Sequence, residues 1–170
     1  MELKSERISI REFRADDVTD LYEILGDEKV MFYCEPAYSF EMTKAFLIEF
    51  CLGKRPVPAF ALVLKTSGKV IGYLLFKSLD SKNEKLFELG WWINQKFWRQ
   101  GFAYEACQLL INHAFTEKIA DRIVSETIDQ NRTKSLMEKL GMTKIELEKR
   151  QEKDNSGLLH DVIWYELKNK

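Results

Sequence analysis

The segment LFELGWWINQKFWRQGFAYEA (residues 86–106) contains the signals that decide the fold. Apolar residues dominate 86–93, which is typical of a buried strand. From Ala103 to Phe115 apolar residues recur at intervals of three and one, the spacing of one helix face. Gly101 lies between the two patterns. The segment therefore predicts a strand, a loop and a helix, with the glycine where the helix begins.

The loop before this helix has features of an anion-binding site. The first amides of a helix lack intrahelical partners and lie at the positive end of the helix dipole. Gly101 would let an anion approach the backbone closely, and Lys96 and Arg99 would add positive charge. The alternative is that the glycine serves only the turn, and the junction alone leaves both interpretations open.

The remaining chain predicts further strands and helices on either side of this segment. Strands are expected at 7–13, 60–65, 70–76, 86–93, 122–128, near 142–150 and at 158–167; helices are expected at 18–25, after Ser39, at 103–116 and at 134–140, ending at Gly141. This order includes one crossover around residues 103–128. It predicts an α/β protein with a largely antiparallel sheet.

The composition is that of a globular domain. The chain has 170 residues, 45% hydrophobic and 31% charged, with a formal net charge of -1, which predicts one domain over residues 1–170. The near-neutral charge argues against nucleic acid and acidic membranes as partners. Ala59–Leu64 is the longest apolar run and is too short to span a bilayer. MELKSERISI lacks the apolar segment of a secretory signal, so we expect a cytoplasmic protein.

Neither the cysteines nor the histidines indicate a metal or disulfide site. Cys34, Cys51 and Cys107 are an odd number without CxxC spacing, which favours free buried thiols. The two histidines, His113 and His160, show no clustered spacing. No metal site is expected.

At this point the sequence resembles the GNAT N-acetyltransferases. Their phosphate-binding signature Q/R-x-x-G-x-G/A is matched by Gly101 and Ala103, whereas Trp98 replaces the first residue, as in the subgroup resembling RimJ and RimL. SERISIREFRADDVTDLYEILGDEKVMFYC, LMEKLGM (136–142) and HDVIWYEL (160–167) resemble the opening, the late helix and the last strand of that subgroup. The resemblance covers nearly the whole chain.

The resemblance implies a mixed, mostly antiparallel sheet of about seven strands with about four helices. It also implies that the sheet is splayed between strands 4 and 5, with acetyl-CoA in the opening. The diphosphate would bind the amides of residues 99–104, and the pantetheine arm would pair with residues 88–93. The residues expected to contact acetyl-CoA are Trp91, Trp92, Ile93, Trp98, Arg99, Gln100, Gly101, Phe102, Ala103, Tyr104 and either Gln130 or Asn131. Gln130 and Asn131 are both candidates. Counting back from Gly141, Gln130 takes the position of the family's late Asn, whereas Asn131 is one residue out of register.

The expected chemistry is attack of a primary amine on the acetyl thioester, which needs a base and donors for the oxyanion. Glu88 interrupts an apolar strand and is the candidate base; the alternative is an ion pair with a neighbouring cation. Backbone amides near Trp91 and Trp92 are candidate oxyanion donors. Where other family members have a Tyr proposed as general acid, this chain has Met137. Thr133 or Ser135 could instead protonate the leaving thiolate.

These observations predict an acetyl-CoA-dependent N-acetyltransferase, a monomer or homodimer. The expected acceptor is a protein or peptide N-terminus. A small amine such as a polyamine, amino acid or aminoglycoside is the alternative acceptor. A non-catalytic acyl-CoA-binding module, or a structural protein without a CoA site, are the alternatives from other classes.

Overall fold

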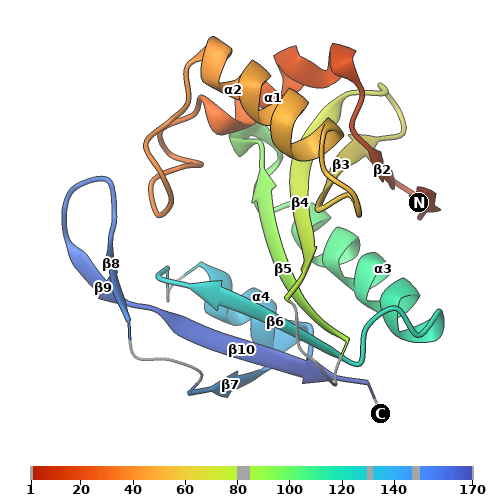
Figure 1. Cartoon of the computed structure of the whole chain (residues 1–170), viewed down its shortest axis with the longest axis vertical. Coiled ribbons are helices and arrows are strands. Elements are labelled where there is room, and N and C mark those ends of the chain that lie inside the picture. Colours follow the sequence, from red (N-terminus) through yellow and green to blue (C-terminus); the bar gives the residue numbers. More distant parts are fainter. Residues whose placement is uncertain (1, 80–84, 130–131, 147–149, 170) are drawn as a thin grey trace.

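The structure is a computed structural model that describes residues 2–79, 85–129, 132–146 and 150–169 (Figure 1). Its strands are β1 (Glu2–Lys4), β2 (Ile8–Glu12), β3 (Ala59–Leu64), β4 (Val70–Ser78), β5 (Leu86–Ile93), β6 (Arg122–Thr127), β7 (Thr143–Ile145), β8 (Gln151–Lys153), β9 (Leu159–Asp161) and β10 (Ile163–Lys168). Its helices are α1 (Val18–Leu25), α2 (Phe40–Phe46), α3 (Phe102–Thr116) and α4 (Thr133–Lys139). Short helical turns cover Ala15–Asp17, Leu47–Leu52 and Gln95–Phe97.

Eight strands form one sheet in the order β1-β2-β3-β4-β5-β6-β10-β7, and β8 and β9 form a separate hairpin. All pairs are antiparallel except β5 and β6, which α3 connects as a crossover. The predicted mixed, mostly antiparallel α/β fold is confirmed, with α3 and α4 packed on one face and α1 and α2 on the other.

The sheet splits between β5 and β6. Their parallel pairing covers only Leu86–Glu88 against Arg122–Val124. Beyond Glu88, β5 continues along β4, whereas β6 continues along β10 (Figure 1). The predicted splay is present, but it falls between the fifth and sixth strands because β1 adds an N-terminal strand that the sequence pattern did not indicate.

Two further expectations, one on the strands and one on the helix after Ser39, need correction. The described residues form more strands than the approximately seven expected, because β1 and β8 lie outside the predicted ranges and the strand predicted at 158–167 is divided into β9 and β10. β8 and β9 pair only with each other and extend from the sheet as a hairpin. The helix after Ser39 changes to a wider helical turn at Leu47.

The helix after Gly101 forms for the reason that the periodicity indicated. Ala106, Cys107, Leu110 and Ile111 are buried on one face of α3 and pack against the sheet. Burying such a stripe is the main source of helix stability in a folded protein. Gly101 precedes the helix with a φ of 83°.

Candidate functional site

A cleft of about 770 Å³ opens where β5 and β6 diverge. The predicted site residues that line it are Glu88, Trp91, Trp92, Ile93, Trp98, Arg99, Gly101, Phe102, Ala103, Tyr104, Thr133 and Ser135. Gln100 is not part of its wall, and its side-chain amide donates to the Lys96 carbonyl at 3.0 Å. Gln130 and Asn131 lie outside the described residues.

The edge of β5 that faces this cleft carries the backbone groups of its odd-numbered residues. Along a strand, the N–H and C=O groups of successive residues face alternate edges. Asn94 N donates to Ile71 O at 2.9 Å, so the even-numbered residues of β5 face β4. The odd-numbered carbonyls of Leu89 and Ile93 accept hydrogen bonds from Ser125 Oγ (2.6 Å) and Trp98 Nε1 (2.7 Å). The Trp91 backbone lies between these two anchors and faces the cleft.

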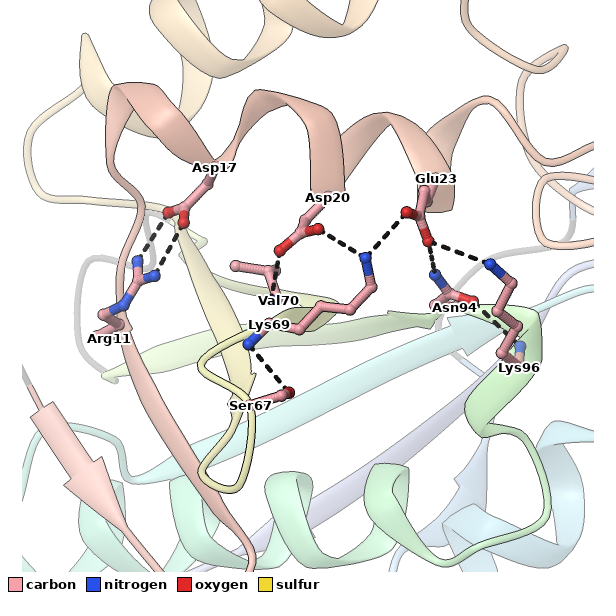
Figure 2. A network of polar contacts seen from close by, with 9 residues as sticks. All are labelled: Arg11, Asp17, Asp20, Glu23, Ser67, Lys69, Val70, Asn94 and Lys96. Carbon is pink, nitrogen blue, oxygen red and sulfur yellow. Dashed lines mark hydrogen bonds and ion pairs between the residues drawn. The ribbon is translucent and has the colours of Figure 1, made fainter.

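Asn94 fixes the start of the loop that leads to α3. It is only 2% exposed. Its Oδ1 accepts from Lys96 N at 3.0 Å, and its Nδ2 donates to Glu23 Oε2 at 3.0 Å (Figure 2). Lys96 Nζ lies 3.6 Å from the same carboxylate, so the charge expected for the anion site is directed at Glu23. The sequence offered a signal for Asn94, since Asn at a turn start often accepts from a nearby amide.

The Glu23 carboxylate stays ionised because of its neighbours. A hydrogen bond from Lys69 (2.9 Å) lowers the pKa of Glu23 against the opposing effect of burial, and Asn94 lowers it further. Lys69 also pairs with Asp20 at 2.7 Å (Figure 2). The start of the loop is therefore tied to α1 by a charged network.

The end of the loop contains two left-handed residues. Arg99 has a φ of 59° and Gly101 a φ of 83°. A Cβ added at Gly101 would meet only Arg7 Nη2, at 3.6 Å. The glycine is therefore required by its backbone conformation and not by crowding from the protein.

Glu88 lies in the cleft, as expected for a base, and also forms the ion pair that was the alternative interpretation. It lines the cleft, and its Oε2 lies 3.5 Å from Lys77 Nζ on β4. The Glu88 side chain is 17% exposed, compared with 48% for Lys77. Because Glu88 and Trp92 are an even number of residues apart, they share the sheet face that α1 and α2 cover.

The two predicted proton donors on α4 differ in their surroundings. Thr133 Oγ1 donates to the Asp129 carbonyl and shares a 2.6 Å hydrogen bond with Thr127 Oγ1. Ser135 is exposed and lines the cleft. Met137 is buried and lines the inner wall.

Side chains from distant segments complete the outer end of the cleft. The Arg132 guanidinium lies 5.1 Å from the ring of Tyr33 and 5.4 Å from that of Trp98, and pairs with Asp129 at 3.0 Å. Cys34 accepts from Trp92 Nε1 at 3.2 Å. The sequence pattern did not indicate Arg132.

Burial controls the chemistry of the thiols. It raises the pKa of Cys34 to about 11, although the Trp92 hydrogen bond partly opposes this effect. Burial alone raises the pKa of Cys51 to about 12. Both thiols are protonated at neutral pH, so neither is an activated nucleophile.

The described residues contain neither a metal-ligand cluster nor a membrane-spanning helix. Within residues 2–79, 85–129, 132–146 and 150–169, no three His, Cys, Asp or Glu side chains are grouped so that they could hold a metal ion. In the same part of the chain, no helix has the length and apolar character needed to cross a membrane.

Comparisons with known proteins agree with this geometry. A sequence model described as "Acetyltransferase (GNAT) domain" matches residues 7–143. The uncharacterized N-acetyltransferase YnaD of Bacillus subtilis (strain 168) is 30% identical over 144 residues, which cover 84% of this chain and 82% of YnaD.

Solved structures share the fold over their whole length. RimL, a ribosomal alpha-N-protein acetyltransferase in complex with coenzyme A, has a TM-score of 0.85 at 20% identity and covers 99% of this chain and 98% of its own. A ribosomal-protein-alanine acetyltransferase from Vibrio fischeri has a TM-score of 0.82 at 20% identity, covering 100% and 97%.

Proposed function

The chain belongs to the GNAT family of acetyl-CoA-dependent N-acetyltransferases, and we propose that its acceptor is the N-terminal amine of a protein or peptide. The names of RimL and the Vibrio fischeri enzyme, which act on ribosomal proteins, support this choice of acceptor and a place in the RimJ/RimL-like subgroup. The observation that supports a chain end over a lysine on a folded surface is a contact that closes over one part of the cleft.

This closure joins the β8–β9 hairpin to the loop between α1 and α2, which lie beside each other in Figure 1. Asn155 donates from its backbone to Phe32 O at 3.0 Å and from its side chain to Met31 O at 3.0 Å. Tyr33 and Glu152 line the cleft on either side of this contact. A flexible chain end or a small amine can enter beneath such a closure more readily than a lysine on a folded surface.

The residues present fit a diphosphate and a pantetheine arm. Gly101 and the first amides of α3, a helix of 15 residues, open onto the cleft, and such a helix start attracts anions. The Trp91 carbonyl offers an acceptor at the edge of β5, where an amide N–H of an extended pantetheine chain could pair as in an added strand. When bound, acetyl-CoA supplies the acetyl thioester.

The chain's own groups would then supply the base, the donor to the oxyanion and the proton for the leaving thiolate. Glu88 accepts a proton from the acceptor ammonium, either directly or through a water. The Trp91 N–H donates to the oxyanion, since the Trp92 amide faces β4. Ser135 is the better donor to the leaving thiolate, because a hydroxyl has a single proton and Thr133 directs its own at Asp129.

The acceptor class is tested by following thiol release from acetyl-CoA with a panel of amines. The panel contains a peptide with a free N-terminus, the same peptide N-blocked but carrying a lysine, a polyamine, an amino acid and an aminoglycoside. We expect turnover with the free N-terminus and little with the blocked peptide. Turnover confined to a small amine would show that the acceptor is that amine and not a peptide N-terminus. Equal turnover of both peptides would also contradict the proposal.

The diphosphate cradle is tested with Gly101→Val. Valine resists a positive φ, so it would force the backbone at Gly101 out of the conformation that is proposed to offer its amides to the diphosphate. Loss of two charge-assisted hydrogen bonds, at about 1.5–3 kcal/mol each, weakens acetyl-CoA binding at least about a hundredfold. A variant with native circular dichroism and unchanged affinity by calorimetry would disprove the cradle.

A further inference from the structure

Arg7, which precedes β2, lies outside the cleft and contacts the loop of residues 94–101 that leads to α3. Its Nη1 donates to the Gln100 carbonyl at 3.1 Å, and its Nε donates to Glu105 Oε2 at 2.7 Å. The guanidinium also lies 4.4 Å from the centre of the Phe102 ring. One side chain thus contacts the loop and the first turn of α3, although it lies more than 90 residues away in the sequence.

The contact with Gln100 determines where the next amide points. In a trans peptide the C=O and the following N–H point in opposite directions. The Gln100 carbonyl is directed at Arg7, which does not line the cleft, whereas Gly101 does. The N–H of Gly101 is therefore directed away from Arg7, toward the cleft side of the loop.

This peptide has little else to hold its orientation. Arg99 and Gly101, on either side of Gln100, are both left-handed, with φ of 59° and 83°. A glycine accepts either sign of φ at similar energy, so rotation of the peptide between them would meet weak resistance.

We propose that Arg7 is a positioning residue, which holds the Gln100–Gly101 peptide so that its N–H faces the diphosphate. The role rests on the diphosphate cradle proposed above. Arg7 is itself held, since Glu105 accepts from both Arg7 and Ser5 Oγ (2.6 Å). Its backbone carbonyl accepts from Lys65 N at 3.0 Å, which fixes its position beside β3.

The test uses Arg7→Gln with two acetyl donors, acetyl-CoA and S-acetylpantetheine, which lacks the diphosphate. If the correct orientation falls to about a tenth of the population, the Kd for acetyl-CoA rises about tenfold. Calorimetry should show this rise. The kcat/KM should fall with acetyl-CoA and stay unchanged with S-acetylpantetheine. An equal loss with both donors, or no loss with either, would overturn the role of Arg7.

Lys65→Gln is the matched control. Its Nζ donates to Ser5 O at 2.9 Å in the same region. The variant therefore removes a nearby charge and one hydrogen bond but no contact with the loop, and it should leave the Kd unchanged. A rise equal to that of Arg7→Gln would mean that general electrostatics cause the effect.

Two further variants separate folding from positioning. If Arg7→Gln does not fold, Glu105→Gln loosens the same guanidinium and should weaken acetyl-CoA binding by a smaller factor; no change in its Kd would refute the role. Weaker binding in Gly101→Val but not in the Arg7 and Glu105 variants would refute only the positioning role. No effect in Gly101→Val would refute the cradle itself.

Discussion

Glu88→Gln, compared with Lys77→Met, separates the catalytic and structural roles of Glu88. The two charges lie 3.5 Å apart, but the Lys77 side chain is 48% exposed. Such a pair contributes at most about 1 kcal/mol to folding. In a chain of 170 residues this corresponds to about 2–4 °C in Tm. Either variant breaks the pair, so both should show this small destabilisation.

Catalysis should distinguish the two variants sharply. A positioned general base contributes about 10²–10⁴-fold, or about 3–5 kcal/mol of activation free energy. Glu88→Gln should therefore lower kcat by that factor with little change in acetyl-CoA affinity, whereas Lys77→Met, which keeps the carboxylate, should lower it little. The loss in Glu88→Gln should shrink as pH rises, because more of the acceptor amine is already neutral.

The assay is steady-state thiol release from acetyl-CoA with the best acceptor of the panel, between pH 6.5 and 9.5. Melting curves of both variants provide the stability comparison. Wild-type turnover in Glu88→Gln at neutral pH would refute the assignment of the base. Equal losses of turnover in both variants would show that the ion pair matters and that the carboxylate is not the base.

Three further predictions concern the cofactor, the loop and the thiols. Acetyl-CoA at about 100 times its Kd should add about 2.7 kcal/mol to the free energy of unfolding, and no shift in Tm at millimolar concentration would contradict the cofactor site. Asn94→Ala removes partners from Lys96 N and from Glu23, so it should destabilise the fold by about 1–3 kcal/mol in urea unfolding; an unchanged midpoint would contradict the anchoring role. Cys34, with a pKa of about 11, should react with iodoacetamide at pH 8 about a hundredfold more slowly than free cysteine, and labelling at the free rate would show an accessible thiolate.

The parts of the fold that the sequence predicted correctly are those with long periodic patterns. The stripe from Ala103 to Phe115 repeats over several helical turns, so the limits of α3 differ by one residue from the prediction. β3 and β4 were recognisable as two apolar runs around a short turn. By contrast, β1 and β8, which were not predicted, have three residues each, too few to show a period.

The candidate site divides in a similar way. Glu88 and Gly101 lie on continuous stretches whose pattern places them at one junction, so they could be predicted. The supporting contacts could not, because they join segments far apart in the chain: Arg7 with Gln100, and Glu23 with Asn94. Such pairs become neighbours only after the sheet and both helical layers have formed.

The split in the sheet also affects self-association. From residue 89 onward, the described part of β5 runs beside the cleft with no strand paired to that edge. Unpaired edges can template aggregation, and proteins often protect them with charges or prolines. The sequence LGWWI (89–93) has neither. Here the protection is steric: the edge is recessed between the two halves of the sheet, where a thin extended molecule can reach it and the edge of another folded sheet cannot.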